Sequence, residues 1–216
     1  HGDFCRGAGV GQAVMSGQPQ ISAGHTHIDL LRHGETQAGS VYLGRTDAPL
    51  SEHGFRQMAE ALLDAPRYHA VLSSPLARCA VFAQDYAQRH GLPLHFDARF
   101  QEIDFGAWDG RSAAEIAAAD AGALENFWRD PVVFTPPQAE PLLSFQARVL
   151  AAWQELPARY PDQRVLLVTH GGVMRIILCH LQQRPLTELL SLSVPHAALH
   201  QAIVVHEQKQ TAQASA

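Results

Sequence analysis

The chain has 216 residues, a length that favours one domain with a full hydrophobic core. Its formal net charge of −5 at pH 7 argues against a nucleic-acid partner, because a phosphate backbone requires clustered Lys and Arg. The sequence contains no run of about 18 apolar residues, so it predicts no membrane span and no membrane partner.

Residues 1–24 are rich in Gly, Ser and Gln and show no sustained hydrophobic period, which predicts a disordered leader outside the fold. The domain is expected over residues 25–207, followed by a flexible tail at 208–216. Within the domain we expect strands at 27–32, 70–73, 164–169 and 199–205, and helices at 51–63, 75–89, 113–119, 124–129, 141–160 and 172–181. Ser51 is a suitable N-cap, and Gly91 a suitable stop for the second helix.

Strands that alternate with helices predict an α/β fold, a three-layer α/β/α sandwich with a mostly parallel sheet. In such sheets, ligands bind beyond the carboxyl ends of the strands. His33 follows the strand HIDLLR, His170 follows RVLLVT, and Ser73 at a third strand end leads into Arg78. These strand ends are therefore the predicted site.

The three cysteines, Cys5, Cys79 and Cys179, are too few and too widely spaced for a disulfide framework or a paired metal motif. Cys79 and Cys179 fall in apolar helical segments, where a free thiol behaves as a small hydrophobic group. This usage favours a reducing, cytoplasmic location.

The segment Arg32-His33-Gly34 places an imidazole beside a guanidinium, whose planar fork matches phosphate oxygens. An imidazole with a pKa of about 6.5 is largely neutral at pH 7 and can attack without a dedicated base. A lone His of this kind is more often structural. The recurrence of a strand-end His at His170-Gly171 favours a functional site.

The segments LLRHGET, SSPLARC, QEIDFGAWDG and VLLVTHGGVMR resemble, in this order, the histidine phosphatase superfamily in its phosphoglycerate-mutase-like branch. The resemblance extends over residues 27–205 and implies a nucleophilic His33 that forms a phosphohistidine. It further implies a phosphate pocket of Arg32, Arg78 and His170, with Gly171 beside it, and Glu102 as the acid and base.

These implied roles agree with the chemistry, since phosphoryl transfer depends mainly on positioning and cationic stabilisation. Glu102 would protonate the leaving oxygen and then deprotonate the attacking water, a role for which Asp104 and Asp109 are alternatives. A metal site of His33, His170 and carboxylates is disfavoured because the adjacent arginines would repel a dication. We therefore expect no metal, no cofactor and a small-molecule phosphate ester as partner.

Within the superfamily the chain most resembles the α-ribazole phosphatases, in GRTDAPLS, FGAWDGRSAAEI and FWRDPVVFTPP. That resemblance implies hydrolysis of α-ribazole 5′-phosphate, or of adenosylcobalamin 5′-phosphate, in cobalamin biosynthesis. Arg45 would contact the substrate, or would simply pair with Asp47 at the surface. Residues 110–141 are expected to cover the substrate.

Three alternatives remain at this point. A broad-specificity sugar-phosphate phosphatase would use the same residues. A phosphoglycerate mutase would return the phosphoryl group to a sugar acid, but residues 110–141 offer only Arg111 and Arg129 for a second anion. A non-catalytic phospholigand-binding module would not need both His33 and Glu102.

Overall fold

The computed structural model describes residues 24–205. The predicted leader, apart from Gly24, the predicted tail and Cys5 lie outside this range. In chain order the elements are β1 (His25–Arg32), α1 (Glu52–Ala61), β2 (Ala70–Ser73), α2 (Ala77–His90), β3 (Leu94–Phe96), the 3₁₀ turns η1 (Ala98–Phe100) and η2 (Gly106–Trp108), α3 (Ala113–Ala119), α4 (Ala121–Arg129), α5 (Leu142–Arg159), β4 (Arg164–Thr169), α6 (Gly171–Leu181), η3 (Leu186–Ser191) and β5 (Leu199–Val205).

The strands form one five-stranded sheet in the order β3-β2-β4-β1-β5. β1, β2, β3 and β4 run parallel, and β5 pairs antiparallel with β1 at one edge. All residues of β2 and β4 are buried, which explains why their sequences are continuous apolar runs rather than alternating ones. The predicted mostly parallel sheet is confirmed.

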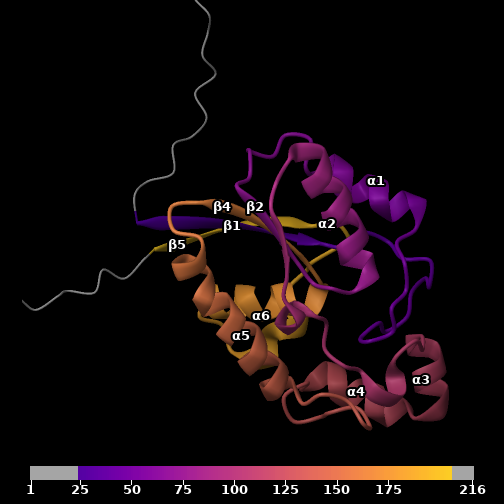
Figure 1. Cartoon of the computed structure of the whole chain (residues 1–216). Coiled ribbons are helices and arrows are strands. Elements are labelled where there is room, and N and C mark those ends of the chain that lie inside the picture. Colours follow the sequence, from indigo (N-terminus) through magenta and orange to yellow (C-terminus); the bar gives the residue numbers. More distant parts are fainter. Residues whose placement is uncertain (1–23, 206–216) are drawn as a thin grey trace, which may run out of the picture.

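Helices cover both faces of the sheet (Figure 1). On one face α1 and α2 pack against the sheet through buried side chains such as Met58 and Phe82. On the other face α5 and α6 do so through Phe145, Trp153 and Ile177. The three-layer α/β/α sandwich is therefore confirmed, and none of the helices within residues 24–205 is long and apolar enough to cross a membrane.

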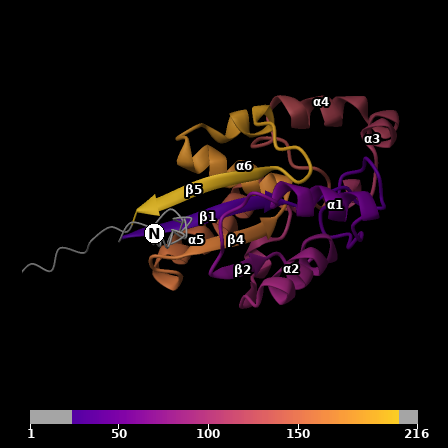
Figure 2. The same ribbon diagram turned by 90° about the horizontal axis from the view of Figure 1, so that it is seen from above.

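α3 and α4 stand apart from the sandwich (Figures 1 and 2) and pack on each other around a small apolar cluster of their own. Ser112 and Glu115 form a capping box that starts α3, and Asp120 caps α4. The cluster contains Trp108 and Phe127. This unit lies in the segment that the sequence predicts as a cover for the substrate.

The predicted helix ends agree with the structure at Ser51, whose side chain accepts the Gly54 N–H, and at Gly91, which has φ +64°. One strand, β3, was not predicted. It has only three residues, all at least partly exposed, at a sheet edge. So short a segment carries no usable hydrophobic alternation.

Candidate active site

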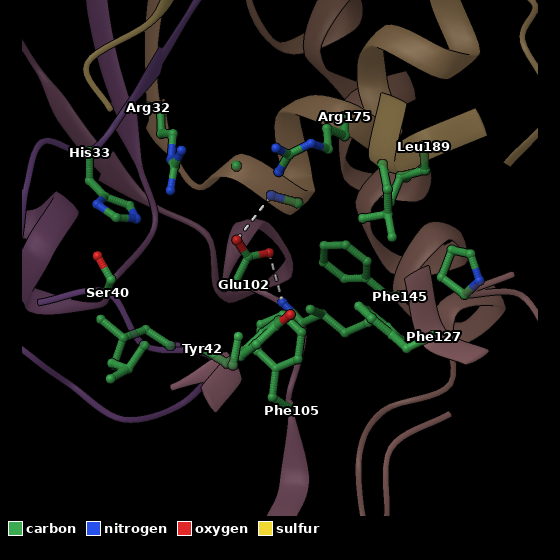
Figure 3. A pocket seen from close by; sticks show the side chains of 18 of the residues that line it. Arg32, His33, Ser40, Tyr42, Glu102, Phe105, Phe127, Phe145, Arg175 and Leu189 are labelled. Carbon is green, nitrogen blue, oxygen red and sulfur yellow. Dashed lines mark hydrogen bonds between the residues drawn. The ribbon is translucent and has the colours of Figure 1, made fainter. Parts of the chain in front are cut away.

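The carboxyl ends of β1 and β4 meet at a cavity of about 520 Å³. Its polar end is lined by Arg32, His33, Glu102, Gly171, Gly172, Arg175 and His196. Figure 3 shows Arg32 and His33 on one side, Arg175 opposite them and Glu102 between. Four of the predicted site residues thus lie at this end of the cavity: Arg32, His33, Glu102 and Gly171.

His33 is held in one tautomer. Its Nδ1 lies 2.8 Å from the Gly34 carbonyl oxygen, which can only accept a hydrogen bond, so Nδ1 carries the proton. The lone pair then resides on Nε2. Burial and the charges of Arg32 and Arg78 lower the pKa of His33 to about 3. The hydrogen bond to Gly34 raises this pKa, but its effect is smaller than that of burial. The ring is therefore neutral at pH 7, the state that a nucleophile requires.

His170 lies next to His33, with the two ring centroids 5.3 Å apart, and is fully buried. Its Nδ1 accepts a hydrogen bond from Arg78 Nε at 3.2 Å, so its proton is on Nε2, 2.7 Å from Ser74 Oγ. Burial and the Arg78 charge hold the pKa of His170 well below its ordinary value. Both ring nitrogens are thus engaged with protein groups.

Arg78 is also fully buried and does not reach the cavity wall. Its terminal nitrogens donate to the carbonyls of Leu43, Gly44 and Thr46 and so hold the loop that follows the nucleophile. The structure therefore brings Arg78 and His170 together directly behind His33, with Arg78 acting on the loop.

Arg45 does not line the cavity. It forms an exposed ion pair of 3.0 Å with Asp104, so the alternative that it pairs with Asp47 is wrong. Asp47 instead accepts the Ala77 N–H at the start of α2. Asp109 accepts the N–H groups of Gly44 and Thr46, which makes it a loop support rather than an acid facing the substrate.

Glu102 faces the cavity from the segment between η1 and η2 (Figure 3). Its Oε2 accepts the Gly172 N–H at 2.9 Å, and its Oε1 accepts the Ile103 N–H at 3.0 Å. A Cβ atom at position 172 would lie 2.2 Å from Oε1, so only glycine leaves room for this carboxylate. Gly172 thereby joins Glu102 to the start of α6.

Gly34 is also constrained by the packing around it. A Cβ at this position would lie 2.0 Å from the Gly54 carbonyl oxygen. The glycine after the nucleophile is therefore required by the packing of the loop against α1.

Arg32 extends along the cavity wall with its backbone at the end of β1. One terminal nitrogen donates to the Val194 carbonyl, while its buried Nε has no hydrogen-bond partner. Burial lowers the pKa of Arg32, Glu102 raises it, and the Arg175 charge lowers it further. Within residues 24–205 neither Arg32 nor Arg175 forms an ion pair, so this end of the cavity is cationic.

The sequence missed several residues of this site. Arg148 forms a 2.7 Å ion pair with Glu140 and donates to the carbonyls of Arg99, Gln101 and Glu102, so it fixes the backbone that carries Glu102. Arg175 and His196 were also missed. Arg148 and Arg175 lie on helices, where the hydrophobic period does not distinguish a functional polar residue from a solvated one.

The other end of the cavity is predominantly apolar, with walls that include Tyr42, Phe105, Phe127, Trp128, Phe145, Leu189 and Leu190. Trp128 is half exposed and donates from Nε1 to the Tyr42 hydroxyl at 3.1 Å. Within the described residues, no three His, Cys, Asp or Glu side chains are grouped so as to hold a metal ion.

Comparison with known proteins identifies the family of the chain. A family model, histidine phosphatase superfamily (branch 1), matches residues 28–215. A bifunctional protein of Mycobacterium tuberculosis is 34% identical over 158 residues, which are 71% of this chain and 43% of that protein. The chain thus spans less than half the length of that relative.

Two further relatives are matched over most of their length. The glucosyl-3-phosphoglycerate phosphatase of Mycobacterium tuberculosis is 32% identical over 168 residues, 72% of this chain and 75% of that protein. The adenosylcobalamin/alpha-ribazole phosphatase of Salmonella typhimurium is 29% identical over 164 residues, 74% of this chain and 81% of that protein.

Solved structures show the same fold. YhfR of Bacillus stearothermophilus superimposes with a TM-score of 0.76 at 29% identity, covering 82% of this chain and 90% of that one. A putative alpha-ribazole-5′-P phosphatase of Escherichia coli gives 0.74 at 25% identity, covering 84% and 91%. With the family match over most of its length, the chain belongs to the histidine phosphatase superfamily.

Proposed function

We propose that the chain is a phosphomonoesterase that transfers a phosphoryl group through a phosphohistidine on His33. The observation that carries this proposal is the tautomer of His33. Its Nδ1 proton is held by the Gly34 carbonyl, the ring is neutral, and the residue lines the cavity. An unprotonated Nε2 at a cationic cavity wall is what nucleophilic attack on phosphorus requires.

In the first step the Nε2–P bond forms while the P–O ester bond breaks, and Glu102 gives its proton to the leaving oxygen. Arg32 and the N-terminus of α6 at Gly171 stabilise the charge on the phosphoryl oxygens. In the second step a water oxygen attacks phosphorus, the N–P bond breaks, and the Glu102 carboxylate takes the water proton. Each step is balanced without a further reactant.

For the substrate we propose α-ribazole 5′-phosphate or adenosylcobalamin 5′-phosphate. The aromatic end of the cavity supports this choice, because a flat apolar base can pack against the rings of Tyr42, Phe105 and Trp128. A sugar alone would leave most of this apolar surface in contact with water. A cytoplasmic location belongs to the same proposal and is supported by the free, buried thiols of Cys79 and Cys179.

Arg175 favours a second candidate substrate. Its guanidinium faces the cavity opposite Arg32 and, within residues 24–205, has no carboxylate partner (Figure 3). A phosphate ester that also bears a carboxylate, such as a phosphoglycerate derivative, would provide that partner. The glucosyl-3-phosphoglycerate phosphatase among the relatives supports this alternative.

The test is phosphate release from α-ribazole 5′-phosphate, glucosyl-3-phosphoglycerate, simple sugar phosphates and phosphoglycerates, each with EDTA present. We expect the ribazole ester to be preferred, and an alkaline quench to trap phosphate on His33 and not on a His33→Ala variant. The variant His53→Ala, an exposed histidine on α1, is the matched control. No release from any ester by the unaltered chain would refute the proposal, and a preference for the glycerate ester would select the second candidate.

A further inference from the structure

His196 lies in the loop between η3 and β5, and its side chain lines the cavity. Its ring centroid is 5.6 Å from that of His33, with the ring planes at 43° to each other. His33 therefore has two imidazoles close to its ring, since His170 lies at 5.3 Å. His170 is fully buried, whereas His196 is an exposed residue that lines the cavity.

The loop that carries His196 is hydrogen-bonded directly to Arg32 and His33. The Arg32 N–H donates to the Ala198 carbonyl at 3.0 Å, and the Ala197 N–H donates to the His33 carbonyl at 3.2 Å. The Arg32 guanidinium donates to the Val194 carbonyl. Three hydrogen bonds on both sides of His196 thus fix its backbone relative to His33.

The backbone of this loop is strained at the residue next to His196. Ala198 donates its N–H to the Pro195 carbonyl at 3.1 Å, which closes a four-residue turn with His196 and Ala197 in the middle. Ala197 has φ +56°, a conformation that favours glycine and costs an alanine about 1 kcal/mol or more. Such strain persists where the surroundings impose it, commonly at functional sites.

The imidazole of His196 is available to a ligand. Within residues 24–205 no hydrogen bond joins its ring to another residue, unlike the rings of His33 and His170. Burial and the Arg32 charge lower its pKa, while the Glu35 carboxylate raises it. A neutral ring still has one N–H to donate, and His196 lines the same cavity as the Arg32 guanidinium, whose charge attracts anions.

We propose that His196 is a phosphate-contacting residue, whose ring N–H donates a hydrogen bond to a phosphoryl oxygen during transfer to and from His33. This proposal rests on the phosphohistidine function proposed above. The N–H donors of the buried residues Arg78 and His170 are engaged with protein groups. In this proposal His196 therefore supplies, together with Arg32, a donor to the phosphoryl oxygens from the cavity side.

The experiment compares His196→Ala, His196→Asn and His196→Gln, with His180→Ala as the matched control. His180 is an exposed histidine in the last turn of α6 and does not line the cavity. We measure kcat/KM for ester hydrolysis, inhibition by orthovanadate, and the melting temperature. Removing a hydrogen bond to a charged group should lower kcat/KM in His196→Ala by about tenfold to a hundredfold.

Orthovanadate inhibition should weaken by a similar factor, because vanadate occupies the place of the transferred phosphoryl group. At least one of the two amide variants, which keep an N–H donor, should restore both values to within about threefold of the unaltered chain. The melting temperature should not change, since the side chain is exposed. His180→Ala should match the unaltered chain in all three measurements.

Values of kcat/KM and vanadate inhibition within twofold of the unaltered chain in His196→Ala would overturn the proposal. A loss of activity that follows a lower melting temperature, and that neither amide restores, would assign His196 a structural role and would overturn it too. If the unaltered chain hydrolyses no ester, the proposed function fails separately. Calorimetric binding of orthovanadate to the same variants then decides the role of His196 by the same criteria.

Discussion

The contact between Gly172 and Glu102 gives the sharpest test of how the acid is held. A Cβ at position 172 would lie 2.2 Å from Glu102 Oε1 and 3.0 Å from its Cδ. In Gly172→Ala the carboxylate must retreat by about 1 Å, and its 2.9 Å hydrogen bond from the residue-172 N–H is lost or bent. The obstacle is the end of a flexible side chain, so the fold should remain intact.

A displacement of about 1 Å in a catalytic group can reduce the rate about a hundredfold, and general acid catalysis contributes about 10² to 10⁴ in all. We therefore expect kcat/KM for an alkyl phosphate to fall about a hundredfold in Gly172→Ala. p-Nitrophenyl phosphate, whose leaving group needs no proton, should lose much less. The ratio kcat/KM is the appropriate measure because it reports formation of the phosphohistidine and not its hydrolysis.

Gly122→Ala is the matched control, because a Cβ there would make only an ordinary contact of 3.5 Å with Asp120. Its two kcat/KM values should equal those of the unaltered chain. The inferred position of the acid is wrong if kcat/KM of Gly172→Ala for the alkyl ester stays within threefold of the unaltered chain. It is also wrong if kcat/KM falls by the same factor for both esters.

Three further predictions concern stability and specificity. Below its ordinary pKa of 6.5 the unfolded chain protonates His33, while the folded chain stays neutral down to about pH 3. The free energy of unfolding should therefore fall by about 2 kcal/mol through His33 from pH 7 to pH 5. In urea unfolding, the midpoint of the unaltered chain should fall more over this pH range than that of His33→Asn, and an equal fall in both would contradict this. Arg164→Met, which leaves the buried Asp29 carboxylate without its 3.3 Å partner, should cost about 3–5 kcal/mol in urea unfolding, and a loss below about 1 kcal/mol would refute it. Trp128→Ala should raise KM about fivefold for the ribazole ester but not for glycerol phosphate, and an equal change for both would remove Trp128 from base binding.

Local sequence patterns were sufficient for most of the architecture. The continuous apolar run RVLLVT predicts a buried parallel strand, and β4 is buried throughout. His170 directly follows this strand and His33 directly follows β1, so the position of both at one edge of the sheet follows from the alternation of strands and helices. Of the strands within residues 24–205, only the short edge strand β3 escaped this reasoning, and the 3₁₀ turns η1, η2 and η3 were not predicted either.

The sequence alone also placed His33, His170 and Arg78 at that edge, because each lies within a few positions of a strand end. Which donors face the cavity was decided only by the tertiary structure. The terminal nitrogens of Arg78 donate to carbonyls of residues 43–46, and Arg45 pairs with Asp104 outside the cavity. His196 lies near His33 because its loop is held by a hydrogen bond from Arg32 to the Val194 carbonyl, and these two residues are 162 positions apart in the sequence. Contacts of this kind depend on how the layers pack and on where turns close, and hydrophobic periodicity records only which face of each element is buried.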